Sequence, residues 1–498
     1  MCRLRAIFIL LLTSISISTA VAQKIDDFSK EFENLRNSVN KEFTDFKKSS
    51  DEELANFRKQ INAEFAEFMG RPWDEFSSSP ALPVPLSPEP PELPVAKPLD
   101  KPSVARLPFK EARKVTPPAE RPRPPIPIPA PLVEPDAPAF SFSFYGTKCT
   151  VGLNPKNKPF MSDISEQSAA ELWTVFSAQD YERFVFDCMK LRENMHLCDW
   201  AYYLLVKTVS EEYYGSEHAG ESILLQLYVL TQSGYKVRIA SANDKLTLLI
   251  PFSNAIYQHS YVTIKGTKYY VMDKSLRGSK FNVFNREYSG ERVPSLQIDE
   301  IPLLKIAEAP SKTFVSQRYP EAKVMVAANR NLIDFYNSYP ISSDWSMYAR
   351  ASMSKQMKNS VLPALRKHIA DKSETEAADI LLNFVQTAFN YQTDDQQFGY
   401  ERPLFADETF FYPYCDCEDR SILFAILVRE LLGLDVVMLH YPKHIATAVC
   451  FRKDFAGDYL TVENRKFTIC DPSFIGASIG RAMEKYKQTE ASVIFLGM

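Results

Sequence analysis

The chain has 498 residues, of which 58 are Lys or Arg and 62 are Asp or Glu, so its formal net charge is only -4. This length allows two or three domains. The nearly balanced charge gives no reason to expect nucleic acid as a partner or strong electrostatic steering of a ligand.

The first 22 residues have the pattern of a secretory signal peptide. Two arginines within the first five residues are followed by an apolar run over residues 6–17 and by the small residues Ala20-Val21-Ala22 before Gln23. An uncleaved membrane anchor is the alternative, although the run is short for a membrane span. We therefore expect an exported protein that is periplasmic, at the cell surface or secreted, and no later segment is long and apolar enough to cross a bilayer.

Residues 23–72 predict an amphipathic helix with an 11-residue repeat. Four units of this length run from residue 25 to residue 68, and Phe32, Phe43, Leu54 and Phe65 share one phase of the repeat. Eleven residues fill three helical turns, so the apolar positions stay on one face of a nearly straight helix. The helix is either a stalk or coiled coil that associates with other copies through residues 25–68, or a helix that lies on its own domain.

Residues 73–139 predict a proline-rich linker, because 20 prolines fall between residues 80 and 138. Proline fixes φ and lacks an amide donor, so an extended, semi-rigid spacer without a core is expected. Binding of this segment to a proline-recognising module is the alternative.

The remainder predicts an α+β fold that contains an internal duplication. Residues 221–239 and 420–438 each have the pattern of a buried helix, a glycine at its end and a strand, and alternating strands follow in both. Residues 140–310 and 311–498 therefore predict two copies of one domain. In the first copy, His218 occupies the position of Cys417, and His259 with Asp273 would form a packed pair that corresponds to His444 with Asp471.

Three residues of the second copy have the types and local settings of a cysteine nucleophile and its partners. Cys417 follows Asp416, a good N-cap, so it would lie in the first turn of a helix over residues 417–432, where the dipole stabilises a thiolate. His444 begins a predicted strand and can serve as general base. Asp471 ends a predicted strand and can orient the imidazole.

Each of these assignments has an alternative. The alternative for Cys417 is a structural or disulfide-bonded cysteine. His440 competes with His444 as the base. Asp419 is more readily a helix-capping partner of Asp416 than a catalytic group. Gln386 is a candidate oxyanion donor, but an exposed helix glutamine is the simpler interpretation. Seven cysteines remain after removal of the signal, an odd number, and Cys450 could pair with Cys470 on a neighbouring strand.

The segment CDCEDRSIL (residues 415–423) resembles the Gly-Asp-Cys-Glu-Asp segment of bacterial transglutaminase-like cysteine proteinases, and KHIATAV and CDPS resemble the His strand and Asp segment of that superfamily. The resemblance covers residues 375–480 well, whereas the first copy resembles the family only weakly and lacks the cysteine. It implies papain-like lobes in which a cysteine-bearing helix packs on an antiparallel sheet that carries His and Asp. It implies acyl transfer through a thioester, with Cys417 as nucleophile, His444 as general base and Asp471 as orienting acid. Cys415 stands where that family usually has glycine.

The function expected from these features is cleavage of peptide or isopeptide amides in a protein or peptide substrate. A transamidase that crosslinks Gln to Lys uses the same triad, and a non-enzymatic cell-surface binding or scaffold protein is the third alternative. The sequence identifies no cofactor and no metal site, and it leaves a calcium requirement open.

Overall fold

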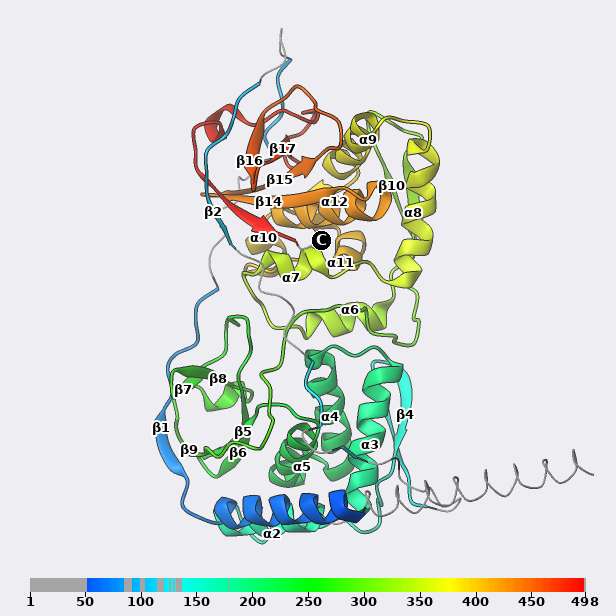
Figure 1. Ribbon diagram of the computed structural model, residues 1–498. Coiled ribbons are helices and arrows are strands. Elements are labelled where there is room, and N and C mark those ends of the chain that lie inside the picture. Colours follow the sequence, from blue (N-terminus) through cyan, green and yellow to red (C-terminus); the bar gives the residue numbers. More distant parts are fainter. Residues whose placement is uncertain are drawn as a thin grey trace, which may run out of the picture. The chain divides into compact units, whose positions relative to one another are not determined.

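A computed structural model describes residues 52–84, 92–98, 104–113, 121–124, 127–128, 130, 137–177 and 179–496 (Figure 1). The predicted signal peptide and residues 25–51 of the repeat lie outside these ranges. The chain divides into two compact units, Met1–Glu64 and Phe65–Met498. The end of the predicted amphipathic helix is helical over residues 52–69. Phe65, the first residue of the second unit, packs with its ring 4.6 Å from that of Trp173.

The second unit has an α+β fold with two lobes. The first lobe comprises residues 140–310 and one strand from the segment before them. Its helices are α2 (Glu166–Phe176), α3 (Gln179–Asn194), α4 (Asp199–Tyr214) and α5 (Ala219–Gln232), and its 3-10 turns are η1 (Ser216–His218) and η2 (Lys274–Leu276). Its strands are β1 (Asp74–Ser77), β3 (Phe140–Phe144), β4 (Thr147–Val151), β5 (Arg238–Ala242), β6 (Lys245–Ile250), β7 (Tyr261–Ile264), β8 (Thr267–Val271) and β9 (Lys280–Phe284).

The second lobe comprises residues 311–496 and one further strand from the same early segment. Its helices are α6 (Arg330–Asn337), α7 (Trp345–Arg350), α8 (Lys355–Ile369), α9 (Glu374–Thr387), α10 (Asp394–Phe398), α11 (Ala406–Phe411) and α12 (Cys417–Leu432), with the 3-10 turn η3 (Glu484–Tyr486). Its strands are β2 (Phe109–Arg113), β10 (Lys312–Val315), β11 (Lys323–Val326), β12 (Asn390–Tyr391), β13 (Tyr414–Cys415), β14 (Asp435–Tyr441), β15 (His444–Cys450), β16 (Tyr459–Val462), β17 (Arg465–Cys470) and β18 (Ala491–Phe495).

The two six-stranded sheets have the same strand order. Their strand orders are β1-β9-β5-β6-β8-β7 and, read in the same direction, β2-β18-β14-β15-β17-β16. A long helix, α5 or α12, precedes each set of strands. The edge strands differ, because β1 runs antiparallel to β9 whereas β2 runs parallel to β18. The strand order is therefore repeated in the two segments for which the sequence predicts an internal duplication. Since both copies belong to one compact unit, the predicted boundary at residues 310 and 311 separates lobes rather than independent units.

The linker prediction for residues 73–139 is wrong for several of its parts. Strand β1 forms the edge of the first sheet, and β2, light blue in Figure 1, lies beside the red C-terminal strand β18. Leu107 is 3% exposed and belongs to the core of the second lobe. Proline is tolerated at sheet edges because an edge strand has one side without ladder partners. Neither β1 nor β2 contains proline, so these two mainly polar segments can complete the sheets although prolines lie on either side of them.

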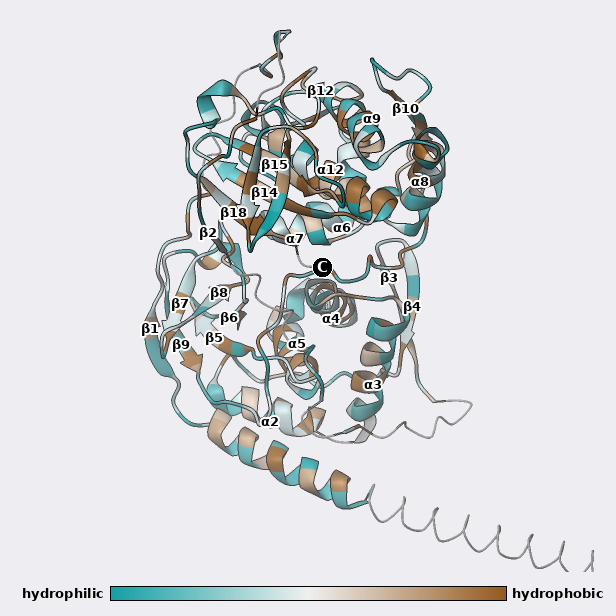
Figure 2. Cartoon of the chain, turned by 45° about the horizontal axis from the view of Figure 1, so that its top comes forward, coloured by the Kyte–Doolittle hydropathy of each residue, from teal (hydrophilic) through white to brown (hydrophobic). Residues whose placement is uncertain are grey.

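Helix α12 is the central helix of the second lobe and packs on β14 and β15. It is buried on nearly all sides from Cys417 to Val428, which explains its apolar sequence (Figure 2). Asp416 caps its N-terminus, and Gly433 ends it in the left-handed region with φ 61°. The opposite side of the sheet packs on a core that includes Val437, Ala446 and Phe467.

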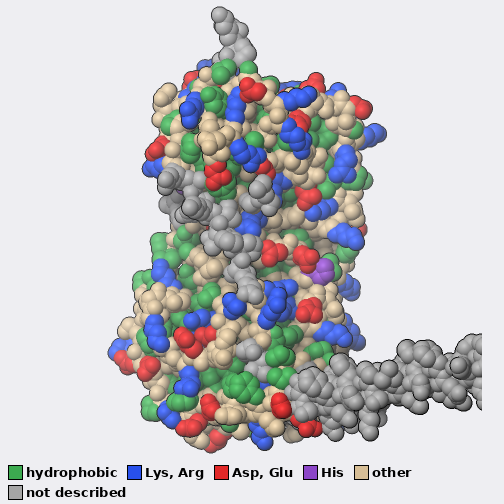
Figure 3. All heavy atoms as spheres, in the orientation of Figure 1, with side chains coloured by type: hydrophobic (Ala, Val, Ile, Leu, Met, Phe, Trp, Pro, Cys, Tyr) green, Lys and Arg blue, Asp and Glu red, His purple; other side chains and the backbone are tan. Residues whose placement is uncertain are grey.

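None of the helices in the described part of the chain is long and apolar enough to cross a membrane. On the face drawn in Figure 3, basic and acidic side chains are interspersed. That face therefore carries no extended area of a single charge.

Candidate active site

Cys417 is the first residue of α12, and it is 1% exposed. Asp416 and Asp419 form the predicted capping pair, in which each carboxylate accepts the backbone N–H of the other residue at 3.3 Å. The thiol therefore lies at the positive end of the helix dipole. Its hydrogen-bond partner is the carboxylate of Glu418, with Sγ 3.2 Å from Oε2.

His444 and Asp471 form a buried pair, with Nε2 2.8 Å from Oδ2 and each residue 3% exposed. The sheet register explains this contact. Strands β15 and β17 run antiparallel with Thr447 opposite Cys470, so the first residue of β15 and the residue after β17 lie at one end of the pair. Because the carboxylate is the partner of Nε2, the imidazole keeps Nδ1 for a different partner.

A hydrogen bond joins the cysteine helix to the histidine strand. Ser421 lies one turn after Cys417, and its Oγ donates to the carbonyl of Ile445, next to His444, at 3.2 Å. This contact brings the first turns of α12 against the start of β15. The sequence-predicted residues thus fall at one end of the α12–β15–β17 layer.

Tyr486, in η3, covers the imidazole. Its ring is 5.0 Å from that of His444 with an interplanar angle of 3°, and it is 4.6 Å from the ring of Tyr441. Burial, Asp471 and Cys417 raise the pKa of Tyr486 to about 12, so its hydroxyl stays neutral. Tyr486 ends a three-residue 3-10 turn, and no sequence motif pointed to it.

Gln386 is not the exposed helix residue that the sequence suggested. It is 2% exposed, and its Nε2 donates to the carbonyls of Asp471, Phe474 and Ala477 at 2.9–3.0 Å. Its Oε1 accepts the N–H of Gly476 at 3.2 Å. The amide is thus fully used in holding the Asp471 segment, so Gln386 positions that segment and is no oxyanion donor in this arrangement.

Arg420 ties α12 to the end of α9. Its guanidinium donates to the carbonyl of Gln386 at 2.8 Å and to that of Phe389 at 2.9 Å. The cysteine helix and the residue that supports Asp471 are thereby connected directly. No sequence motif pointed to this role of Arg420.

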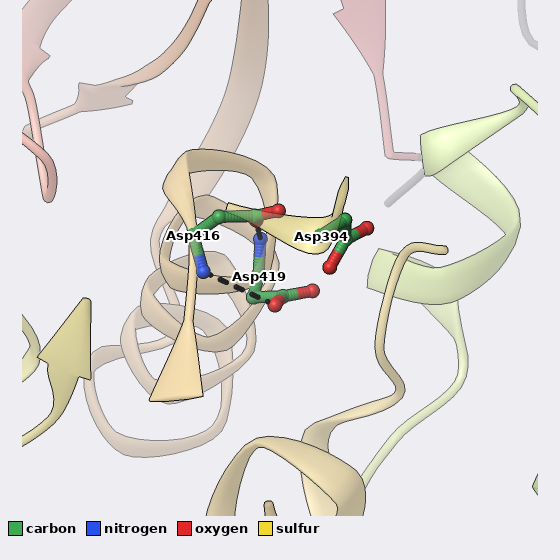
Figure 4. Close-up of side chains that lie close together, drawn as sticks. All are labelled: Asp394, Asp416 and Asp419. Carbon is green, nitrogen blue, oxygen red and sulfur yellow. Dashed lines mark hydrogen bonds between the residues drawn. The ribbon is translucent and has the colours of Figure 1, made fainter. Parts of the chain in front are cut away.

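Buried carboxylates surround the start of α12. One oxygen each of Asp394, Asp416 and Asp419 lies within 4.8 Å of the others, and Asp394 belongs to a second such group with Glu401 and Glu418. Figure 4 shows the carboxylates of Asp394 and Asp419 turned toward each other. Burial and the neighbouring carboxylates raise the pKa of Asp394 far above its ordinary value.

This acidic cluster can be stabilised in two ways. Its carboxylates can share protons, or they can bind a hard cation such as Ca²⁺, which takes six to eight oxygen ligands. A cation there would neutralise charge beside the thiol and take no part in bond making. Asp394, the first residue of α10, and Glu401, in the loop after that helix, were not expected from the sequence, because no motif marks either position.

The seven cysteines of the described residues form no disulfide. Cys450 does not pair with Cys470, because Cys470 lies opposite Thr447 and Cys450 lies opposite Asp435. Cys415 is 1% exposed, and burial raises its pKa to about 12, so it is a neutral packing residue. His440 is exposed and contacts the ring of Trp345 at 4.8 Å, away from the acid that holds His444.

The first lobe does not retain the expected His–Asp pair. Nδ1 of His259 lies 3.1 Å from the carbonyl of Tyr257, whereas Asp273 caps η2 through the N–H of Ser275 at 2.8 Å. His218 contacts the ring of Phe160 at 4.4 Å.

The strand registers also correct the correspondence between the lobes. Tyr441 pairs with His444 at the β14–β15 turn, and Ala242 pairs with Lys245 at the matching β5–β6 turn. The counterpart of His444 is therefore Lys245 and not His259. Asp273 does correspond to Asp471, because each follows its strand at the same distance from the preceding turn.

Comparisons of the chain with protein-family models, with curated proteins and with solved structures found no match.

Proposed function

We propose that the protein is an exported cysteine hydrolase of the transglutaminase-like type that cleaves peptide or isopeptide amides through a thioester at Cys417. The observation that carries the proposal is the buried hydrogen bond of 2.8 Å between His444 Nε2 and Asp471 Oδ2. It leaves Nδ1 to serve a thiol at the start of the adjacent helix. Papain-like lobes are part of this proposal, supported by a cysteine-bearing helix on an antiparallel sheet that carries His and Asp.

The proposed reaction uses the imidazole twice. Nδ1 of His444 takes the thiol proton, and the sulfur attacks the amide carbonyl of the substrate. When the C–N bond breaks, the imidazolium returns the proton to the leaving amine, and a thioester remains on Cys417. Water then attacks the thioester, His444 accepts its proton and the thiol is restored. Asp471 stabilises the imidazolium and fixes the ring orientation throughout.

A crosslinking transamidase differs only in the second step. A lysine amine replaces water as the group that attacks the thioester, and the product is an isopeptide bond. The triad serves both reactions, so the products decide between them.

A non-enzymatic scaffold is favoured by a different observation. Cys417 is 1% exposed and its thiol donates to Glu418, so a substrate can reach the sulfur only after side chains move. The first lobe also has the same strand order, with His218 at the sequence position that matches the nucleophile. If the buried thiol of Cys417 never becomes accessible and reactive, the second lobe would be a non-catalytic binding module, as the first lobe would be.

The decisive experiment is alkylation of the folded protein by iodoacetamide at pH 7, with each cysteine followed by peptide mass spectrometry. Cys450 is an internal reference, since it is the partly exposed member of the seven cysteines in the described ranges. We expect Cys417 to react faster than Cys450 and to lose that advantage in His444→Ala. Labelling of Cys417 that is slower than that of Cys450 and unchanged in His444→Ala would favour the scaffold. Trapping an acyl group on Cys417 would then identify the substrate.

A further inference from the structure

A cavity of about 340 Å³ lies between the two lobes of the second unit. Its first-lobe wall comes from α4 and from the segments around His259 and Lys274, and its second-lobe wall comes from residues 336–341 and 400–408. This volume is typical of sites for small ligands or for one or two residues of a peptide.

The basic groups of the cavity suit an anion. His259 is 8% exposed, and burial together with Lys274 and Arg277 lowers its pKa. Lys274 is an exposed residue of the cavity lining, and partial burial of its side chain together with Arg277 lowers its pKa. Among the described residues, no carboxylate forms an ion pair with Lys274. A bound anion would offset the repulsion and desolvation that disfavour this cation.

The other charged groups of the cavity already have partners. Arg402 is paired with the buried Glu408, and Lys207 lies 3.4 Å from Glu211. The excess positive charge is thus that of one lysine beside a neutral imidazole. One carboxylate matches this charge better than a phosphate dianion, which proteins bind with several arginines or amides.

The walls are aromatic. Trp200, Tyr203, Tyr348 and Phe405 line the cavity, and flat aromatic rings pack well against aromatic or apolar side chains of a ligand. Gln258, also in the lining, has φ 61°, a left-handed conformation that is uncommon for a side chain of this kind and is found more often at binding sites.

One short segment connects the cavity to the thiol. Tyr400, Arg402 and Phe405 line the cavity, whereas the N–H of Leu404 donates to Asp419 at 2.7 Å, in the capping pair of the cysteine helix. A peptide that occupies the cavity would therefore bind beside the segment that supports the start of α12.

We propose that this cavity binds a glutamate or aspartate carboxylate next to an aromatic residue in a peptide, and that the first lobe is retained because it supplies Lys274 and His259 to this site. The role of the cavity in choosing a substrate rests on the proposed function, whereas binding itself does not.

Isothermal titration calorimetry on the full chain with Cys417→Ala tests the proposal without turnover. The probes are two blocked dipeptides, acetyl-Glu-Tyr-amide and acetyl-Gln-Tyr-amide, which differ by one charge. We expect the Glu peptide to bind at least tenfold more tightly, a difference of about 1.4 kcal/mol. Lys274→Met should abolish that preference, and Lys268→Met, a change at an exposed lysine outside the cavity, should preserve it.

Equal affinity of the two peptides, no binding of either at millimolar concentration, or an unchanged preference in Lys274→Met would overturn the proposal. Lys274→Gln serves as a second variant if the methionine variant unfolds. Because the nucleophile is absent from the protein under test, these outcomes are independent of the alkylation of Cys417. A negative result for peptide binding in the cavity can therefore be distinguished from a negative result for catalysis at Cys417.

Discussion

Replacement of Gln386 by leucine should destabilise the second lobe by about 4 kcal/mol. The substitution keeps a similar volume but leaves four polar groups without their partner: the buried carbonyls of Asp471, Phe474 and Ala477 and the partly buried N–H of Gly476. A buried group that loses its hydrogen bond costs about 1–3 kcal/mol. The lower end applies because Gly476 is exposed and water can reach part of this segment.

The assay is equilibrium unfolding in urea, followed by circular dichroism, with the control variant Gln226→Leu. Gln226 is 0% exposed in α5, but the hydrogen bond of its amide nitrogen is local, to Ser222 at 3.2 Å. We expect that control to lose no more than about 1 kcal/mol. In conditions where Gln386→Leu is still folded, the alkylation of Cys417 should also slow, because Asp471 is no longer held against His444.

The reasoning is refuted if Gln386→Leu and Gln226→Leu have equal stabilities within about 0.5 kcal/mol. The claim that Gln386 holds Asp471 against His444 is refuted if Gln386→Leu is destabilised but Cys417 is alkylated at the original rate. The first outcome would mean that the four groups find water at no cost. The second would mean that Asp471 keeps its position without Gln386.

Three further predictions concern the site. Burial and neighbouring carboxylates raise the pKa of Asp394 in the folded state, so in the absence of a bound cation this residue destabilises the folded protein increasingly as the pH rises above the ordinary aspartate pKa near 4. Asp394→Asn should therefore gain stability relative to the unmodified protein between pH 5 and pH 8, measured by urea unfolding. A constant difference in stability over this range would contradict the prediction. Tyr486→Leu should slow alkylation of Cys417 several-fold at pH 7 and change its pH profile, whereas Tyr486→Phe, which keeps the ring over His444, should not; identical profiles for both variants would show that the ring stacking has no role. His218→Ala should leave the alkylation rate of Cys417 unchanged, and a loss of labelling in the folded variant would assign the first lobe a part in the chemistry.

Local patterns account for what was predicted correctly. The helix at Cys417 has an acidic cap and a terminal glycine, and the capping pair of Asp416 and Asp419 is present as expected. The alternation of apolar residues indicated the strands that carry His444 and precede Asp471. These signals act over a few residues, because capping and strand alternation depend on the nearest turns of the backbone.

Errors arose where residues distant in the sequence meet. His259 was matched to His444 by its place before a strand, but the sheet register assigns that position to Lys245. The proline-rich segment was interpreted as a spacer, yet its short strands β1 and β2 complete both sheets. Strand order and register depend on pairing across many residues, so composition alone does not reveal them.

The sequence by itself determined the α+β character, and its patterns predicted the duplication and the three residues that we propose as a thiol site. Only the tertiary structure decided that the acid holds Nε2, that Gln386 and Tyr486 support the pair, and that buried carboxylates crowd the thiol. The physical reason is the range of the interactions: a cap or an alternating strand forms within one short segment, whereas a buried polar contact exists only after distant strands and helices have packed in register.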